Sequence, residues 1–139
     1  MMADRLLLDA CAMIAYLNDE EGADKIEELL WQSDRGSGHL FMHEVNLLEV
    51  YYGVYREEGE KLAEETFERI TNLPIEVVVG LREGVLKEAG RLKAIYKVSL
   101  ADSIALAEAK VKRLALVTCD HHEFDRLQEA KELDFVWIR

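Results

Sequence analysis

The sequence predicts an α/β fold in which helices join the strands of a parallel sheet. Short apolar runs recur along the chain, and longer segments with the 3.6-residue periodicity of amphipathic helices separate them. Strands and helices that alternate in this way form βαβ units with right-handed crossovers. The 139 residues are half hydrophobic and include one proline, so we expect a single packed domain over residues 1–139 without repeats or linkers.

The first third of the chain begins with a predicted strand at residues 5–9, a short apolar run that ends in an acid. Residues 10–17 follow as a short apolar helix, and residues 21–31 have the apolar stripe of an amphipathic helix. A glycine-containing turn at residues 34–38 leads to a second strand at residues 39–42. This part of the chain therefore supplies two strands.

The middle of the chain is mostly helical. Residues 45–55 and 60–70 have helical spacing, and Pro74 ends the second of these helices because proline has no amide hydrogen to donate. The β-branched run at residues 75–79 predicts a third strand, and the apolar spacing of residues 81–96 predicts a long helix.

The last third contains two further strands. A helix is predicted at residues 100–112, followed by an apolar strand at residues 114–118. A short helix at residues 122–132 then leads to a final strand at residues 135–138. The chain therefore has five predicted strands.

The charge of the chain is strongly acidic. Its 17 basic and 28 acidic residues give a formal net charge of −11, and the acids are concentrated before residue 73. A protein of this charge does not attract nucleic acid by its overall field, so a phosphate-binding site needs local basic groups.

Cysteine content and hydropathy exclude several other classes. Two cysteines, Cys11 and Cys119, are too few for a disulfide framework or a zinc site. The apolar stretch 6–17 is interrupted by Asp9, and no run is long enough to span a membrane. We expect a protein that does not contact a membrane and is cytoplasmic. No glycine-rich phosphate loop or nucleophile elbow is present, and we expect His121 and His122 to be loop residues.

Two acids follow predicted strands. Asp9 follows the first strand and Asp120 the fourth, and ligands bind parallel sheets beyond the carboxyl ends of the strands. Each residue also has a purely structural alternative, since aspartate commonly caps the N-terminus of a helix.

Two further acids occupy helix positions where carboxylates are uncommon. Glu49 lies on the apolar side of its predicted helix, where it either binds a ligand or forms a buried ion pair with Arg56. Asp102 lies among small apolar residues, and with Ser99 it also fits a helix-capping pattern. Four such carboxylates brought together would repel one another unless a cation neutralised them, and Mg²⁺ or Mn²⁺ prefers oxygen ligands.

The four stretches that carry these acids resemble the PIN domain family, and in particular its VapC-type toxin nucleases. The resemblance extends over nearly the whole chain, with all four motifs in order. The stretches are LLLDACAMIAYL (6–17), VNLLEVYYG (45–53), LADSIALA (100–107) and LVTCDHHEF (116–124).

The resemblance implies a three-layer α/β/α sandwich with about five parallel strands in the order 3-2-1-4-5. It also implies an Mg²⁺- or Mn²⁺-dependent endoribonuclease that is the toxin of a type II toxin–antitoxin pair, with RNA as substrate, an antitoxin as partner and a homodimeric state. The catalytic and metal-binding residues it implies are Asp9, Glu49, Asp102 and Asp120.

The resemblance also assigns supporting residues. Thr118 would orient the fourth acid, whereas Cys11 stands where the family more often has serine or asparagine. The implied strand order brings Cys11 near Cys119, and we expect both to be reduced thiols because cytoplasmic proteins rarely form disulfides. Local basic groups for RNA would come from the eight lysines and arginines between residues 82 and 113, whose alternative is an ordinary solvated surface.

Two other functions compete with this interpretation. A PIN-like domain could serve as a binding module with weak or no nuclease activity. A phosphoacceptor receiver domain has a similar size and sheet, but it needs paired acids after the first strand, and Asp9 has no acidic neighbour.

Overall fold

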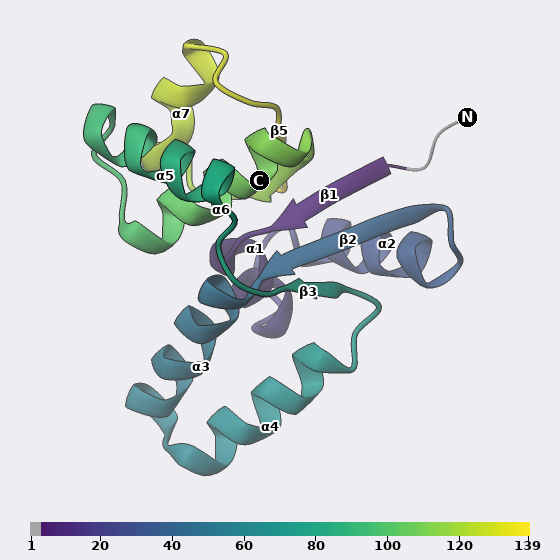
Figure 1. Ribbon diagram of the computed structural model, residues 1–139. Coiled ribbons are helices and arrows are strands. Elements are labelled where there is room, and N and C mark those ends of the chain that lie inside the picture. The colour runs from purple at the N-terminus through teal and green to yellow at the C-terminus, as the bar shows by residue number, and fades with distance from the viewer. Residues whose placement is uncertain (1–3) are drawn as a thin grey trace.

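The structure is a computed structural model that describes residues 4–139, with one or two helices between successive strands (Figure 1). The strands are β1 (Asp4–Leu8), β2 (Gly38–His43), β3 (Glu76–Val78), β4 (Ala115–Thr118) and β5 (Phe135–Trp137). The helices are α1 (Ala10–Leu17), α2 (Ala23–Asp34), α3 (Glu44–Glu58), α4 (Glu60–Thr71), α5 (Glu83–Ile95), α6 (Leu100–Lys112) and α7 (His121–Glu129).

The five strands form one sheet in the order β3-β2-β1-β4-β5, and every neighbouring pair is parallel. The predicted sheet and strand order are therefore confirmed. Because all strands run the same way, their carboxyl ends lie along one edge, where β1 passes into α1 and β4 leads to α7.

Side chains of the central strand alternate between two hydrophobic cores. Leu7 of β1 packs on one face of the sheet with residues of α5, α6 and α7, whereas Leu6 and Leu8 pack on the other face with α1 and α2. Alternation of this kind follows from the two-residue period of a strand. Helices therefore cover both faces, which confirms the three-layer architecture, while α3 and α4 extend together from the sheet (Figure 1).

Helix α6 lies in the interior of the molecule. Residues 103–109 are all buried, and five of them have no exposed surface: Ser103, Ala105, Leu106, Ala107 and Ala109. The helix contacts α3, α5, β1, β2 and β4, and its small side chains permit this close packing. The N-terminus of α6, which carries Asp102, is thereby fixed against the rest of the fold.

Several predicted boundaries were wrong by a few residues. Helix α2 begins at Ala23 because Gly22 has a φ of 96° and lies so near Ile138 that a Cβ atom would approach its carbonyl oxygen to 2.7 Å. Helix α7 begins at His121 and ends at Glu129, so His121 and His122 form its first turn and are not loop residues. Within residues 4–139, no helix is long and apolar enough to cross a membrane.

Candidate functional site

Asp9 is a buried carboxylate at the carboxyl end of β1. Only 2% of the residue is exposed, and its Oδ1 accepts a 2.8 Å hydrogen bond from the Ala12 amide, so it also caps α1. The pKa of Asp9 is raised to about 7, mainly by burial and also by repulsion from Asp102 and Asp120. Hydrogen bonds from Thr118 and Ala12 partly oppose this rise. Asp9 therefore does cap α1, as the structural alternative predicted, but its carboxylate is buried where the charged form is disfavoured.

Asp102 lies in the first turn of α6 and is half-buried. The cap of this helix is Ser99, whose Oγ accepts a 3.1 Å hydrogen bond from the Asp102 amide. The pKa of the Asp102 carboxyl is raised to about 6, mainly by burial and also by the charges of Asp120 and Glu123, while a hydrogen bond with Ser99 opposes the rise. The Asp102 carboxylate is therefore close to two other acids.

Glu49 lies on α3 and is half-exposed. Its predicted alternative was an ion pair with Arg56, but Arg56 instead contacts Glu57 at 3.3 Å. Burial raises the pKa of Glu49, and the charge of Asp102 raises it further. Glu49 and Asp102 thus face the same region from two different helices.

Asp120 connects β4 to α7. Its Oδ1 accepts a 3.1 Å hydrogen bond from the Glu123 amide and caps α7, and its own amide donates to Thr118 Oγ1 at 3.2 Å. Thr118 is buried and hydrogen-bonded to Asp9 as well, so one hydroxyl contacts both strand ends. This is the position in which Thr118 can orient the β4–α7 loop.

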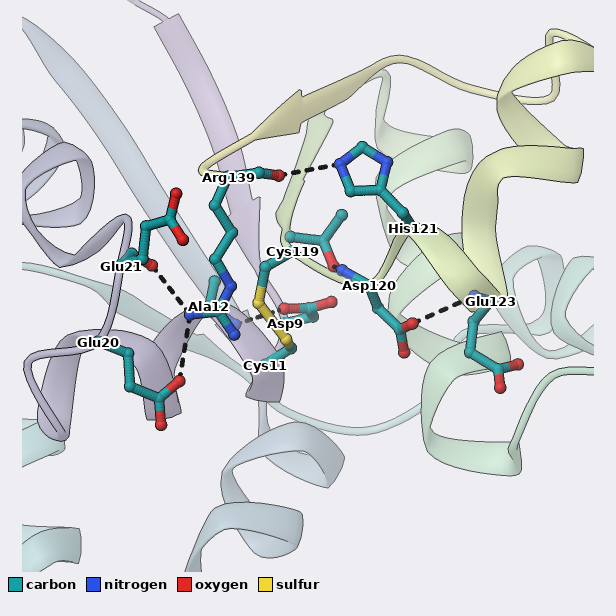
Figure 2. Close-up of a disulfide and its surroundings, with 11 residues drawn as sticks. Asp9, Cys11, Ala12, Glu20, Glu21, Cys119, Asp120, His121, Glu123 and Arg139 are labelled. Atoms are coloured by element: carbon teal, nitrogen blue, oxygen red, sulfur yellow. Dashed lines mark hydrogen bonds and ion pairs between the residues drawn. A yellow bond between two sulfur atoms is a disulfide. The ribbon is translucent and has the colours of Figure 1, made fainter.

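Three of the four predicted acids line a cleft of about 770 Å³ at the carboxyl edge of the sheet. Glu49, Asp102 and Asp120 line it, and Asp9 lies close enough to the last two for their charges to affect it. Glu123, which the sequence analysis did not identify, lines the cleft as a fifth carboxylate. Figure 2 shows Asp9, Asp120 and Glu123 on adjacent segments.

The donor set suits a hard divalent cation. Within residues 4–139, none of these five carboxylates forms an ion pair with a lysine, arginine or histidine. In the described chain no three His, Cys, Asp or Glu side chains are close enough to hold an ion as they stand, so binding requires side-chain rotation. Carboxylate oxygens without a basic partner nevertheless fit Mg²⁺ or Mn²⁺, and the pKa values of Asp9, Glu49 and Asp102 are raised.

Cys11 and Cys119 are joined by a disulfide, with 6.2 Å between their Cα atoms (Figure 2). The expectation that they lie near each other is confirmed, and the expectation of reduced thiols is wrong. The physical reason is that β1 and β4 are adjacent and in register, with Leu8 opposite Val117. This register places the Cα atoms of the two cysteines within the range of roughly 4.4–6.8 Å that a disulfide requires.

Asn46 is a second buried residue that the sequence analysis missed. It lies three residues before Glu49 on α3 and has no exposed surface. Its Nδ2 donates to the carbonyl oxygen of Ala101, next to Asp102, at 3.3 Å, and its Oδ1 has no hydrogen-bond partner. A buried asparagine therefore links the two helices that carry Glu49 and Asp102. Its spacing from Glu49 was the signal available in the sequence.

Four of the eight basic residues between 82 and 113 form ion pairs. Lys87 pairs with Glu83, and Lys112 pairs with Glu108. Arg91 and Lys110 both contact Glu88 and Glu132. By contrast, Lys93 and Lys97 line the acidic cleft, where Lys93 Nζ donates to the Val98 carbonyl at 3.0 Å. Of the eight expected basic residues, two lysines therefore line the cleft.

Comparison with solved structures identifies the same fold elsewhere. The chain is similar to a DNA-bound VapBC from Salmonella typhimurium, with TM-score 0.75, 16% identity and complete coverage of both chains. It is also similar to VapBC2 from Rickettsia felis bound to a promoter DNA fragment, with TM-score 0.74, 15% identity and coverage of 95% of this chain and 97% of that one. VapBC-1 from nontypeable Haemophilus influenzae gives TM-score 0.73 and 17% identity, covering 96% and 98%.

The sequence itself supports a family assignment. None of the curated proteins matches the chain in sequence. The family model of the PIN domain, however, matches residues 6–130, a span that begins within β1, ends beyond α7 and includes all five carboxylates. The chain belongs to the PIN domain family.

Proposed function

We propose that this protein is a metal-dependent endoribonuclease and the toxin of a type II toxin–antitoxin pair. The observation that supports it most is a cleft lined by carboxylates of α3, α6 and the β4–α7 loop, with the buried Asp9 carboxylate near the last two at the end of β1. Three of the structural neighbours come from VapBC complexes, and another is a toxin–antitoxin complex from Klebsiella pneumoniae. These relatives support an antitoxin as partner, and we extend the proposal to a homodimer in the cytoplasm.

Four carboxylates would hold one or two Mg²⁺ or Mn²⁺ ions. They are Asp9, Glu49, Asp102 and Asp120, and Glu123 is placed to join them. When bound, such an ion supplies a Lewis acid that lowers the pKa of water and neutralises charge on the phosphate. Hydrolysis then joins a water oxygen to phosphorus and breaks one phosphorus–oxygen bond of the RNA backbone.

The protein contributes proton release and positioning. Asp9 and Asp102 have raised pKa values, so each must lose a proton before it can bind a cation. Ser99 and Thr118 fix the backbone next to Asp102 and Asp120 through hydrogen bonds. Lys93 and Lys97 lie at the cleft, where their ammonium groups can contact the phosphates on either side of the scissile bond.

Replacement of Asp102 by asparagine tests the proposal. Asp102→Asn keeps the size of the side chain but removes a charged oxygen ligand, so we expect Mn²⁺-dependent cleavage of RNA to fall about 100-fold or more. The measurement is cleavage of a labelled RNA with Mn²⁺ and with EDTA. Asp24→Asn is the matched control, because Asp24 is also in the first turn of a helix but is exposed and far from the cleft along the chain.

Two outcomes would contradict the proposal. Equal cleavage by the wild type and Asp102→Asn would remove Asp102 from the reaction. No cleavage by a folded wild-type protein at any Mn²⁺ concentration would instead favour a PIN-fold binding module.

A further inference from the structure

A disulfide lies between two of the proposed metal-binding residues. Cys11 is two residues after Asp9 in the first turn of α1, and Cys119 immediately precedes Asp120 (Figure 2). The bond connects positions 108 residues apart in the sequence. Both cysteines are partly exposed, so a small reductant can reach them.

The disulfide continues a connection that the sheet begins. Leu8 is paired with Val117, and the Asp9 amide donates to the Val117 carbonyl at 3.3 Å. Beyond this hydrogen bond β1 and β4 have ended, and the chain turns into α1 on one side and toward α7 on the other. The disulfide then joins the two segments covalently at the level of the carboxylates.

Apart from the shared contact with the Thr118 hydroxyl, the two acids depend on separate local hydrogen bonds. Asp9 is hydrogen-bonded to the start of α1, and Asp120 is hydrogen-bonded to the start of α7. Their charges repel each other, which favours separation of the two segments. A covalent link opposes that separation and reduces the conformational freedom that must be lost when both carboxylates bind one ion.

We propose that the Cys11–Cys119 disulfide positions Asp9 and Asp120 for a shared divalent cation, so that its reduction by a dithiol weakens cation binding and RNA cleavage. Cys11 and Cys119 are positioning residues, since they act through the two aspartates. The inference rests on the proposed metal-dependent function, but cation affinity tests it independently of RNA.

The redox step is a thiol–disulfide exchange with a dithiol such as dithiothreitol. A thiolate of the reductant attacks one sulfur, breaks the sulfur–sulfur bond and forms a mixed disulfide. The second thiol of the reductant then displaces the protein sulfur and closes a cyclic disulfide. Two electrons and two protons pass to the protein, which leaves thiols at Cys11 and Cys119, while the dithiol is oxidised.

The central experiment measures the Kd of Mn²⁺ by calorimetry for three samples. These are the oxidised protein, the protein reduced with dithiothreitol and desalted without oxygen, and the variant Cys11→Ser/Cys119→Ser. Counting free thiols confirms the redox state, since the chain has only these two cysteines. We expect the Kd to rise about tenfold on reduction and to recover on reoxidation. The double variant should have the Kd of the reduced protein and should not respond to dithiothreitol.

A control separates positioning from general stabilisation. A disulfide that closes a long loop also stabilises the fold. Leu30→Ala, in the buried face of α2, removes stability by a similar amount without altering the carboxylate cleft. Circular dichroism ensures that every sample is folded at the temperature of the titration. Leu30→Ala should bind Mn²⁺ with the wild-type Kd.

The outcomes distinguish this inference from the proposed function. A tenfold change in Kd without RNA cleavage by any sample would support the positioning role and contradict the nuclease. RNA cleavage that is insensitive to reduction, with the same Kd in all samples, would overturn the positioning role and leave the nuclease in place. Absence of Mn²⁺ binding by the oxidised protein would overturn the positioning role, because no cation would then be shared.

Discussion

At the scale of single residues, Asp9 combines a structural role with an unfavourable charge. Its carboxylate caps α1 through Ala12, yet burial and the neighbouring acids raise its pKa to about 7. Below that pH the folded protein holds a proton on Asp9, and above it the protein contains a buried charge without a basic partner in the described chain. A divalent cation is the natural replacement for that proton.

The pKa of Asp9 predicts how stability depends on pH without metal. Between the ordinary value of 3.8 and about 7, the folded state keeps a proton that the unfolded state has released. The free energy of unfolding should therefore fall as pH rises through this window, by at most roughly 4 kcal/mol from Asp9. Asp102, whose pKa is raised to about 6, acts in the same direction.

Urea denaturation in EDTA at pH 5 and pH 8 measures this effect. Asp9→Asn, which cannot ionise, should lose most of the dependence, whereas Asp24→Asn should retain it. Added Mn²⁺ should stabilise the wild type more at pH 8 than at pH 5, because the carboxylates are then free of protons. Two results would contradict the raised pKa of Asp9. One is a free energy of unfolding that rises from pH 5 to pH 8 in EDTA, and the other is the same pH dependence in the wild type and Asp9→Asn.

At the scale of helices and strands, the cleft depends on how α3 and α6 are held together. Asn46 of α3, three residues before Glu49, donates a hydrogen bond to the Ala101 carbonyl of α6. Ala101 immediately precedes Asp102. The small residues of α6, such as Ala105, let this helix approach its neighbours closely. The geometry of Glu49 and Asp102 is therefore set by an interhelical contact as well as by the sheet.

Loss of the Asn46 side chain should weaken this contact measurably. Asn46→Ala removes the hydrogen bond to the half-buried Ala101 carbonyl, so we expect the free energy of unfolding to fall by about 1 kcal/mol. Asn18→Ala, at the exposed end of α1, should change it by less than about 0.5 kcal/mol. Chemical denaturation of the three proteins compares them, and equal stability of Asn46→Ala and wild type would show that the bridge has no energetic effect.

At the scale of the whole molecule, the pattern of the sequence predicted the parallel sheet, and the resemblance to the PIN family implied the two helical layers and the strand order, all of which the structure confirms. The periodicity of apolar residues located every element, and Ala10–Leu17 and Leu100–Lys112 were predicted with the bounds that the structure has. The acids were predicted individually, because Asp9 and Asp120 follow strands and because the motifs resemble those of the PIN family. Their roles in binding metal are still proposals.

Other features depend on contacts that the sequence pattern does not reveal. Glu123 occupies an ordinary position in the first turn of a helix, and only the orientation of α7 brings it to the cleft. The disulfide was missed because the expected compartment argued against it, while the adjacency of β1 and β4 favoured it. Ion pairing of Arg91 and Lys110 with Glu132 is equally a tertiary effect, since Glu132 lies in the loop after α7.

The most direct test of the account is the location of Mn²⁺ in a crystal of the oxidised protein. Anomalous diffraction at the manganese edge identifies the ion without ambiguity. The account predicts one or two peaks in the cleft, with oxygen atoms of Asp9, Asp102 or Asp120 roughly 2.0–2.3 Å from the metal. A fully loaded crystal in which Mn²⁺ lies only elsewhere on the surface would contradict the central claim that these carboxylates form one metal site.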